Sequence, residues 1–575
     1  MTARLGEPAI WERQRCDEPQ AALLAAELGV SPVLARLLWL RGLTDPGDAR
    51  RFLNPSLDHL HDPMRLAGMA AAVDRLQAAI TRGERIAIHG DYDVDGITAT
   101  VILRRTIELL GGQVVHFIPE RIRDGYGLQP PAIDRLHAEG VQLVVSVDCG
   151  IRGLDAARRA RELGVDLIVT DHHEQERALP PAVAVVNPKR ADCTYPDKNL
   201  AGVGVVLKLV QALCGRYGRE KWLPAFVKMA AIGTLADVVP LVGENRVIAK
   251  LGLELLSRGP NKVGLRTLLE TSGLSGKTID GHQVAFILAP RVNAAGRMST
   301  PDIAMRLLLA SDEAMVEEAR TLAEQLNSEN LRRQREEEDI LTEARAIIER
   351  DPDIGAGSVL VVAGQGWHRG VVGIVASRLV DAFSRPVIVL GIEDDIAHGS
   401  CRSVERFDML AALERCADHL LRFGGHRLAA GLALEAARVA DFRAAINACA
   451  AEMLGPDDLV PRLRVDGRLS FRSITPVLAA EVASLAPFGP GNPRPVFEAA
   501  GVEIVDGPRR IKDRHLKMAL RADGRTLRAI AWRAVEREEF LAAHRQSVDV
   551  AFSLEQNTYN GETSVELSIA DVKAS

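Results

Sequence analysis

The stretch RIAIHGDYDVDG, residues 85–96, indicates how the chain is expected to fold. It begins as a short apolar run, which is typical of a buried β-strand, and ends in acidic residues and glycine. Four more short β-type runs follow, separated by amphipathic helical stretches. They are VVHFIP at 114–119, VQLVVSVD at 141–148, VDLIVTD at 165–171 and AVAVVNP at 182–188. This alternation predicts an α/β fold, with a parallel sheet covered by helices on both faces.

The sequence on either side predicts further parts. Residues 1–65 suggest an N-terminal helical segment, and 66–310 the parallel-sheet domain, which becomes mainly helical after residue 199. Residues 311–352 are dense in helix formers and predict a long helix that joins two domains. A coiled coil stays open as the alternative, although the apolar residues keep no sustained heptad. A smaller α/β domain is expected at 353–455, and the many short β-type runs of 456–575 favour an OB-like β-barrel.

Composition narrows the class of protein. The chain has 575 residues, of which 47% are hydrophobic and 26% charged, as in ordinary globular proteins with several domains. No apolar run approaches the about 20 residues of a membrane span, and no signal peptide is apparent, so a cytoplasmic location is expected. The seven scattered cysteines contain no C-x-x-C pair, which favours neither disulfides nor a zinc ribbon. A net charge of −6 argues against an overall basic nucleic-acid binder but leaves local basic surfaces open.

Residues of the type that bind metals follow the ends of the predicted strands. In an open parallel sheet the carboxyl ends of the strands line one crevice, so such side chains can converge from distant positions. Each one alone also has an ordinary explanation, as a turn residue, a helix cap or a buried acid with a partner. Their repetition at successive strand ends favours a site. The candidates are His89, Asp93, Asp95, Asp148, His172, His173 and Asp237.

This set of residues suits one kind of chemistry. Carboxylates close together repel one another unless cations lie between them. Two divalent ions about 3.5–4 Å apart can activate a water and neutralise charge on a phosphodiester. Mixed histidine and aspartate ligands suit Mn²⁺, with Mg²⁺ as the substitute. The sequence therefore predicts phosphodiester hydrolysis that uses Mn²⁺ or Mg²⁺, with two ions per site.

Several motifs resemble known families. HGDYDVDG, SVDCG, TDHH and GTLADVVP resemble the four motifs of the DHH phosphoesterase superfamily, and GWHRGVVGIVASRL, GSCRS and FGGHRLAAG are similar to its DHHA1 substrate domain. IPERIRDGYGL, PRVNAAGR and APFGPGNPRPVF resemble the bacterial RecJ family of single-strand DNA exonucleases. The resemblance runs from about residue 70 to the end. One departure is Cys401, where the family usually has Gly, and this leaves the local backbone in doubt.

The resemblance implies an activity and the roles of individual residues. His89, Asp93 and Asp148 would hold one ion, and Asp95, Asp148, His172 and Asp237 the other. Asp148 would bridge the two ions, and His173 would face the scissile phosphate, so both are implied as catalytic. The implied substrate-binding residues are Arg121, Arg291, Asn293, Arg297, His368, Arg402, Ser403, Gly425 and His426. The implied activity is that of a 5′-to-3′ exonuclease, specific for single-stranded DNA, which releases 5′-mononucleotides in DNA repair and recombination.

A basic stripe in the last domain offers a second contact for nucleic acid. Residues 505–534 contain nine Lys or Arg against three Asp or Glu, with Trp532 near the end. Single-strand binders combine such grooves with stacking aromatics, so Arg509, Arg510 and Lys512 are expected to bind the strand. A solvated basic face without a partner stays open. Single-stranded DNA is the expected partner of a monomeric chain, and a single-strand-binding protein and a helicase are further candidates.

Other functions stay open at this stage. The chain could be another phosphodiesterase of the superfamily, such as a pyrophosphatase, an oligoribonuclease or a cyclic-dinucleotide phosphodiesterase. It could also be an inactive scaffold that binds DNA or replication proteins, although every expected ligand position is filled. A tRNA-synthetase editing module is the third alternative, but no synthetase core is visible.

Overall fold

The computed structural model describes residues 9–121, 123–125, 127–175, 178–260, 262–559 and 562–575. Ile122 and Tyr126 of the IPERIRDGYGL motif lie outside the described residues. The chain divides into two compact units. The first comprises Met1–Pro46, Arg333–Ser484 and Arg494–Ser575, and the second comprises Gly47–Arg332 and Leu485–Pro493.

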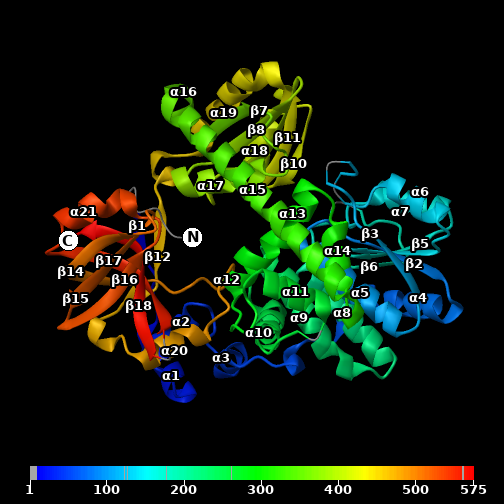
Figure 1. Cartoon of the computed structure of the whole chain (residues 1–575), viewed down its shortest axis with the longest axis horizontal. Helices are drawn as coiled ribbons and strands as arrows, with labels where there is room; N and C mark the ends of the chain where they lie inside the picture. Colours follow the sequence, from blue (N-terminus) through cyan, green and yellow to red (C-terminus); the bar gives the residue numbers. More distant parts are fainter. Residues whose placement is uncertain (1–8, 122, 126, 176–177, 261, 560–561) are drawn as a thin grey trace. The chain divides into compact units, whose positions relative to one another are not determined.

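The second unit contains the predicted parallel sheet (Figure 1). Its strand order is β3-β2-β4-β5-β6, and all neighbours are parallel. The strands are β2 (Arg85–His89), β3 (Gln113–Phe117), β4 (Leu143–Val147), β5 (Asp166–Thr170) and β6 (Ala184–Val186). The predicted α/β sheet is therefore confirmed.

Helices cover both faces of this sheet, because successive side chains of a strand point to opposite faces. Ile86 and Val145 pack in one core with α4 (Met69–Arg82), α5 (Val94–Leu109) and α8 (Gly202–Arg216). Ala87 and Val144 pack in another core with α6 (Pro130–Ala138) and α7 (Leu154–Glu162). Burial on both faces explains why these strands are almost continuously apolar.

The rest of the second unit is helical, as expected from residue 199 onward. The elements are α9 (Leu223–Ala236), α10 (Gly243–Ser257), α11 (Val263–Thr271), α12 (Gly281–Gln283), a π-helical turn (Val284–Leu288), α13 (Ala289–Met298) and α14 (Asp302–Leu309). The π-helical turn continues directly into α13. Pro290 has no backbone N–H to donate to the preceding turn, which accords with the irregular π-type hydrogen bonding just before it.

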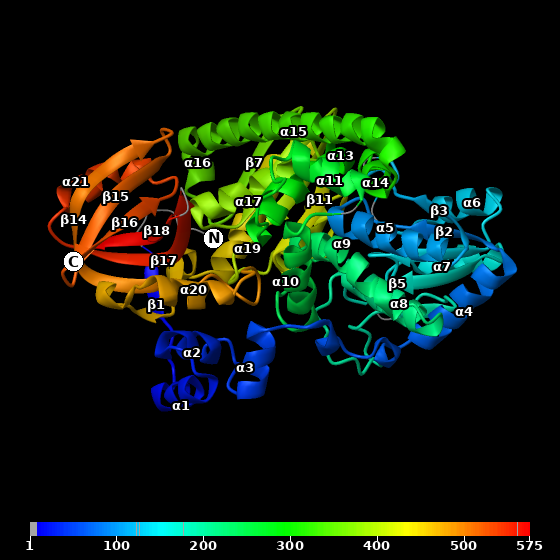
Figure 2. The same cartoon turned by 60° about the horizontal axis from the view of Figure 1, so that its bottom comes forward.

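A long helix, α15 (Val316–Arg350), follows and contains 35 residues. It is drawn as one uninterrupted ribbon in Figure 2, and the boundary between the two units falls inside it, after Arg332. The predicted joining helix is therefore confirmed.

The first unit contains a smaller α/β sheet. Its strand order is β10-β11-β9-β8-β7, in which only β7 and β8 are parallel. The strands are β7 (Leu360–Gln365), β8 (Val387–Glu393), β9 (Ile396–Arg402), β10 (Arg422–His426) and β11 (Ala429–Glu435). Its longer helices are α17 (Val372–Phe383), α18 (Met409–Arg415) and α19 (Val439–Met453).

The C-terminal part of the first unit is a closed barrel. Five strands follow one another in the order β14-β15-β16-β18-β17, and pairing of β14 with β17 closes the ring. Closure confirms the OB-like barrel and removes the free sheet edges. The strands are β14 (Phe497–Ile511), β15 (His515–Ala522), β16 (Arg525–Ala531), β17 (Val548–Tyr559) and β18 (Glu562–Ala574).

The N-terminal segment differs from the helical expectation in one element. It contains α1 (Glu18–Leu28), α2 (Pro32–Trp39) and α3 (Pro46–Leu53), but also a strand, β1 (Ile10–Arg13), which pairs in parallel with β12 (Arg462–Val465). Trp11 fixes this strand by donating from Nε1 to Asp571 at 2.7 Å. Partners some 450 or more positions away create the strand, so no local pattern could reveal it.

Among the described residues no single helix is long and apolar enough to cross a membrane. Helices α1 and α2 meet that test only as a pair, with a bend of 116° between them.

Candidate active site

Most of the predicted metal ligands come together at the carboxyl end of the second unit's sheet. Three groups of side chains each place their ligand atoms within 4.8 Å of one another. The groups are Asp91, Asp93 and Asp148; Asp95, His172 and Asp237; and Asp148, His172 and His173. Because the groups share Asp148 and His172, they form one continuous acidic cluster. We call these seven residues the acidic cluster.

The loop between β2 and α5 supplies three of the acids. Asp93 caps α5, and its carboxylate accepts a hydrogen bond from Gly96 N at 3.0 Å. The loop folds back closely enough that a Cβ on Gly96 would lie 2.5 Å from Asp91 N, so glycine is required there. Asp95, two residues later in the first turn of α5, accepts from the N–H groups of Gly202 and Val203 at 2.7 Å each. The start of α8 therefore holds Asp95 in place.

The other members of the cluster come from strand and helix ends. Asp148 follows β4 with φ at 60°, a left-handed conformation that costs energy in a non-glycine residue and that is often found at functional sites. His172 follows β5, and Asp237 follows α9. His172 Nε2 lies 3.2 Å from a carboxylate oxygen of Asp148 and 3.7 Å from one of Asp237. A histidine nitrogen that faces several carboxylates suits a shared cation.

Buried polar atoms without partners support this interpretation. Asp148 Oδ1, Asp237 Oδ2 and His89 Nε2 are buried and make no hydrogen bond with any described residue. Such atoms are normally paired in folded proteins, because an unpaired buried polar group costs free energy. Cations bound in the cluster would supply the missing partner of the two carboxylates, so the donor set fits divalent ions.

Two features of the structure bear on the first predicted ligand set, which stays a prediction. His89 belongs to none of the three groups, and its Nδ1 lies 3.6 Å from Cys149 Sγ. Asp91, which the sequence reasoning omitted, joins Asp93 and Asp148 instead. The alternation of acids at 91, 93 and 95 was the signal that could have revealed Asp91.

The electrostatics of the cluster also favour a bound cation. Burial, reinforced by the neighbouring carboxylates, raises the pKa of Asp148 and of Asp95 well above the usual range. Burial and the charge of Asp93 raise the pKa of Asp91 to about 8. These carboxylates therefore oppose one another's ionisation, and divalent ions reverse that effect by stabilising the charged forms.

His173 has a different environment from His172. Its Nδ1 lies 2.7 Å from Asp171, which also accepts a hydrogen bond from Ile151 N at 2.9 Å. Burial alone lowers the pKa of His173, but the contact with Asp171 outweighs burial and raises it. Burial opposes ionisation of Asp171, yet His173 holds the pKa of Asp171 down at about 2. The pair therefore favours a positively charged His173 beside the cluster.

Two residues that the predicted site set did not include hold His173 in place. Asp171 fixes the ring, and the buried Asn187 donates from Nδ2 to the carbonyl oxygen of His173 at 2.9 Å. Asp171 stands in the TDHH motif and could have been included on that basis. Asn187 ends a different strand run, and only the fold brings it here.

Three of the four predicted substrate residues of the second unit contact or act on the 91–95 loop. The Arg121 guanidinium lies 5.3 Å from the ring centroid of Tyr92. Asn293 Oδ1 accepts from Val94 N at 3.1 Å, so α13 supports the loop directly. Arg291 donates to Ile287 O at 2.6 Å within its own helical segment. Arg297 lies in the last turn of α13 and acts electrostatically on Tyr92.

The other predicted substrate residues belong to the first unit. Strand pairing sets Arg402 of β9 opposite Ala429 of β11, and Ala429 opposite His426 of β10. Ser403 follows Arg402 and donates to Phe407 O at 2.8 Å, while His368 accepts from Gly370 N at 3.0 Å. This brings Arg402, Ser403 and His426 to one end of the sheet.

Glycine and cysteine have distinct roles in this sheet. Gly425 has φ of 150°, and a Cβ there would lie 2.5 Å from Ala429 O, so a side chain would collide with β11. Cys401 is buried in the hydrophobic core, and burial raises the pKa of its thiol to about 12. Its side chain thus packs as a small apolar group inside β9, which retains regular pairing on both sides.

The basic stripe is less positive than its sequence suggested. Arg509 pairs with Asp506 at 2.7 Å, and Arg510 pairs with Glu538 of α21 (Glu538–Ala543). Lys512 stands between β14 and β15 with φ of 49°. Trp532 is 42% exposed and lies against His515, with ring centroids 4.9 Å apart. Nearby acids therefore neutralise part of the stripe.

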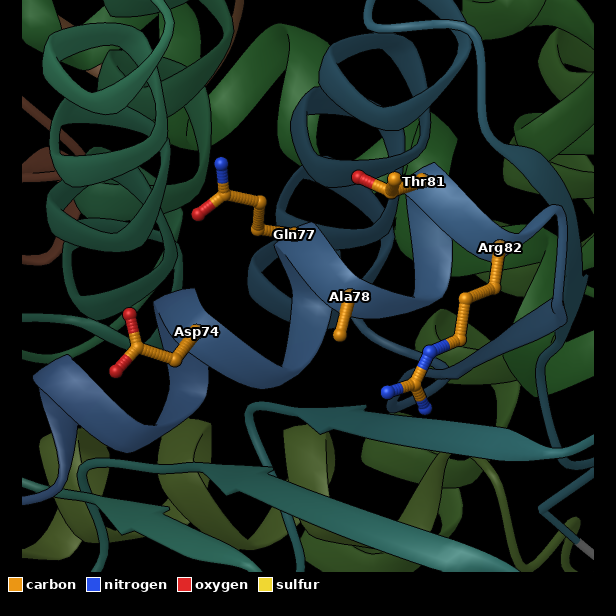
Figure 3. Close-up of a pocket in the computed structure, with 5 residues that line it drawn as sticks. All are labelled: Asp74, Gln77, Ala78, Thr81 and Arg82. Atoms are coloured by element: carbon orange, nitrogen blue, oxygen red, sulfur yellow. The ribbon is translucent and has the colours of Figure 1, made fainter.

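One pocket of about 340 Å³ lies along α4, and none of its lining residues belongs to the acidic cluster. Figure 3 shows its lining side chains, which all come from α4: Asp74, Gln77, Ala78, Thr81 and Arg82. Arg216 of α8 donates to both Asp74 and Gln77 at 2.8 Å. Asp74 and Gln77 are thus already paired with Arg216, and no predicted site residue lines the pocket. It is therefore not our candidate active site.

Comparison with family models covers the main parts of the chain. The model of the DHH family, N-terminal domain, matches residues 85–234, that of the DHHA1 domain matches 356–452, and that of the RecJ OB domain matches 465–571. The chain is 40% identical over 572 residues to the single-stranded-DNA-specific exonuclease RecJ of Bacillus subtilis, covering 98% of this chain and 71% of the relative. Its identity to the Escherichia coli protein of that name is 34%, covering 97% and 98% of the two chains.

The fold also matches solved structures. RecJ from Thermus thermophilus in complex with Mn²⁺ matches with a TM-score of 0.83 at 35% identity, covering 98% of this chain and 79% of that one. RecJ from the same organism in complex with Mg²⁺ matches with a TM-score of 0.78 at 33% identity, covering 98% and 78%. Near-complete coverage at this identity means that the chain belongs to the RecJ family of single-stranded-DNA-specific exonucleases.

Proposed function

We propose that the chain is a metal-dependent exodeoxyribonuclease that degrades single-stranded DNA from 5′ to 3′, releases 5′-mononucleotides and acts in DNA repair and recombination. The observation that carries this proposal is the buried acidic cluster at the ends of parallel strands in a chain 40% identical to a RecJ exonuclease. A chain without intact metal ligands would instead suggest an inactive scaffold.

The residues of the cluster divide into two candidate ion sites. Asp91, Asp93 and Asp148 would hold one Mn²⁺ or Mg²⁺ ion, and His89 Nε2 is a further candidate donor for it. Asp95, His172 and Asp237, again with Asp148, would hold the other. When bound, such ions activate a water and neutralise charge on the oxygens of the scissile phosphodiester.

The protein's own groups do the remaining work. Asp171 orients the ring of His173 and raises its pKa, which favours the imidazolium form, and in that form His173 would neutralise charge on the scissile phosphate. When both ring nitrogens carry protons, Nε2 is the one that can face the substrate, since Nδ1 is engaged by Asp171. Asn187 fixes the main chain of His173 and so limits how far the ring can move.

Each unit would supply its own residues for binding the strand. In the second unit these are Arg121, Arg291, Asn293 and Arg297, and in the first unit His368, Arg402, Ser403, Gly425 and His426. Arg509, Arg510 and Lys512 of the barrel would bind the strand further along. We propose that the chain has five parts. They are an N-terminal segment at 1–65, the DHH domain at 66–310, the connecting helix at 311–352, the DHHA1 domain at 353–455 and the OB-like domain at 456–575.

We further propose that the chain works as a monomer in the cytoplasm on single-stranded DNA, with a single-strand-binding protein and a helicase as partners. The test of the function itself is direct. The protein is incubated with Mn²⁺ or Mg²⁺ and end-labelled single-stranded DNA, duplex DNA, RNA or pyrophosphate. Mononucleotides released only from the 5′ end of single-stranded DNA are expected. Preferential hydrolysis of RNA or pyrophosphate would instead identify another DHH-type phosphodiesterase, and no hydrolysis an inactive scaffold.

Replacing Arg402 with alanine should remove the preference for a 5′-phosphate. Charge-assisted hydrogen bonds to phosphate contribute about 1.5–3 kcal/mol, so kcat/KM on a 5′-phosphorylated strand should fall by about one to two orders of magnitude. Activity on a 5′-hydroxyl strand should change little. The measurement compares both strands with both proteins. Arg422→Ala is the matched control, because Arg422 is exposed at the opposite end of β10 from His426. A wild-type enzyme that ignores the 5′ group would rule out the phosphate site.

Reversing the charges of Arg509, Arg510 and Lys512 should weaken binding of long strands and flatten its salt dependence. Each lost phosphate contact should reduce the slope of log K against log salt by about 0.7, the value for single strands. Because Asp506 and Glu538 partly neutralise this stripe, we expect fewer than three contacts to be lost. Hydrolysis of very short oligonucleotides should be unaffected. Arg158→Glu on α7 provides the control, and equal losses on short and long strands would contradict a separate binding surface.

A further inference from the structure

Phe286 is an exposed aromatic residue of the second unit that the proposed chemistry does not use. Its side chain is 68% exposed, whereas Val284 and Leu288, on either side of it in the π-helical turn, are buried. The ring of His282 lies beside the phenyl ring, with centroids 4.7 Å apart and planes tilted by 31°. Single exposed apolar residues are common, so exposure alone points to no ligand. The position of Phe286 is more informative.

The helical segment that carries Phe286 is fixed to the 91–95 loop. The π-helical turn continues into α13, where Asn293 accepts a hydrogen bond from Val94 N at 3.1 Å. Further along α13, a Cβ on Gly296 would lie 2.8 Å from Tyr92 O, so helix and loop are in close contact. Phe286 precedes Asn293 by seven residues, or about 10 Å of helix.

The same π-helical turn packs against α9, the helix that Asp237 follows. Leu235, in the last turn of α9, shares one core with Val284 and Leu288. The helical segment that carries Phe286 therefore packs against two parts of the acidic cluster's surroundings, which are the 91–95 loop and the end of α9. Short π-helical turns inside helices are frequent at functional sites.

We propose that Phe286, backed by His282, stacks on a base of the bound single strand close to the reacting phosphate. This inference rests on the proposed function, which supplies the strand. A phenyl ring accepts any base, because every base has a π-face, so the contact fits an exonuclease that must degrade all sequences. Bases inside a duplex are already stacked on both sides, so the contact also favours unpaired strands. Phe286 holds the substrate in position and does not touch the reacting atoms.

The test combines a protein change with a DNA change. Wild type, Phe286→Ala and Phe286→Trp are compared on 5′-phosphorylated strands in which one base at a time near the 5′ end is replaced by an abasic residue. Phe286→Ala should lower kcat/KM on the intact strand by about five- to 100-fold, and Phe286→Trp should retain most of it. At one abasic position the kcat/KM of wild type should fall by a similar factor relative to the intact strand. The kcat/KM of Phe286→Ala should be the same on this abasic strand as on the intact strand. Bis(p-nitrophenyl) phosphate is a small phosphodiester without bases. All three proteins should hydrolyse it at the same rate.

The control and the outcomes separate this inference from the proposed function. Leu109→Ala is the matched control, because Leu109 is 58% exposed at the end of α5, about 20 Å along the helix from Asp95. If wild type does not degrade single-stranded DNA, the proposed function fails. If it does, the inference is overturned by wild-type activity of Phe286→Ala or by equal abasic losses in both proteins. The inference is also overturned if no abasic position lowers the kcat/KM of wild type. This outcome does not depend on how any variant folds.

Discussion

Replacing Asp148 with asparagine should lower kcat by a factor of about 10³ or more, equivalent to at least about 4 kcal/mol of transition-state stabilisation. Asp148 contributes to two of the three ligand groups, so its loss affects both candidate ion sites at once. Asparagine is the informative substitute, because it tolerates the left-handed φ of 60° better than alanine does. The measurement is single-turnover cleavage of a labelled single strand over a range of Mn²⁺ concentrations.

The metal-free stability of this variant distinguishes a lost ligand from a damaged fold. Asp148→Asn removes repulsion among buried carboxylates, so the metal-free variant should unfold at no lower temperature than wild type. Wild type should gain stability on addition of Mn²⁺, because the ions bind only the folded state, and the variant should gain less. Asp237→Asn, which removes a ligand from one group only, should be partly rescued by high Mn²⁺. Asp155→Asn at an exposed site on α7 should behave as wild type, and an active Asp148→Asn enzyme would refute the shared-ligand model.

Local patterns were sufficient to predict the central sheet. Four of the five strands of the second unit lie within the predicted runs, and β3 begins one residue before its run, because a buried parallel strand is a short apolar segment wherever it occurs. Strand β1 was missed for the opposite reason, since Ile10–Arg13 becomes a strand only by pairing with Arg462–Val465. The π-helical turn before α13 was not predicted either; its buried Val284 and Leu288 share a core with Leu235 of α9.

The candidate site was predictable where topology determines it. Asp95, Asp148, His172 and Asp237 converge because strand and helix ends of an α/β fold meet at one edge. The finer assignments depend on coordinates. Asp91 forms a group with Asp93 through the path of the loop after β2, which packs Asp91 closely against Gly96 in the first turn of α5. The ion pairs of Arg509 and Arg510 depend in part on Glu538, which lies 28 positions from Arg510 and gives no signal in the stripe itself.

Replacing Asp171 with asparagine should lower kcat by about 10² to 10⁴, with little change in KM. Loss of a carboxylate that orients a catalytic histidine has an effect of this size in hydrolases built on such a pair. Asparagine keeps the shape of the side chain but removes the charge that outweighs burial and raises the pKa of His173. The pKa of His173 should then fall, and its ring should be less firmly oriented beside the phosphate. Steady-state kinetics on a 5′-phosphorylated strand gives kcat and KM separately.

A double-variant cycle tests whether Asp171 acts through His173. If it does, Asp171→Asn should add little to the loss already caused by His173→Ala, because effects of residues that act as a unit are not additive. If Asp171 instead supports the fold through its hydrogen bond with Ile151, the two losses should multiply and the unfolding temperature of Asp171→Asn should fall. Asp155→Asn again controls for removing one acid from this unit. Multiplying losses with an unchanged unfolding temperature would also reject the pair, since Asp171 would then contribute to catalysis by a route that does not involve His173.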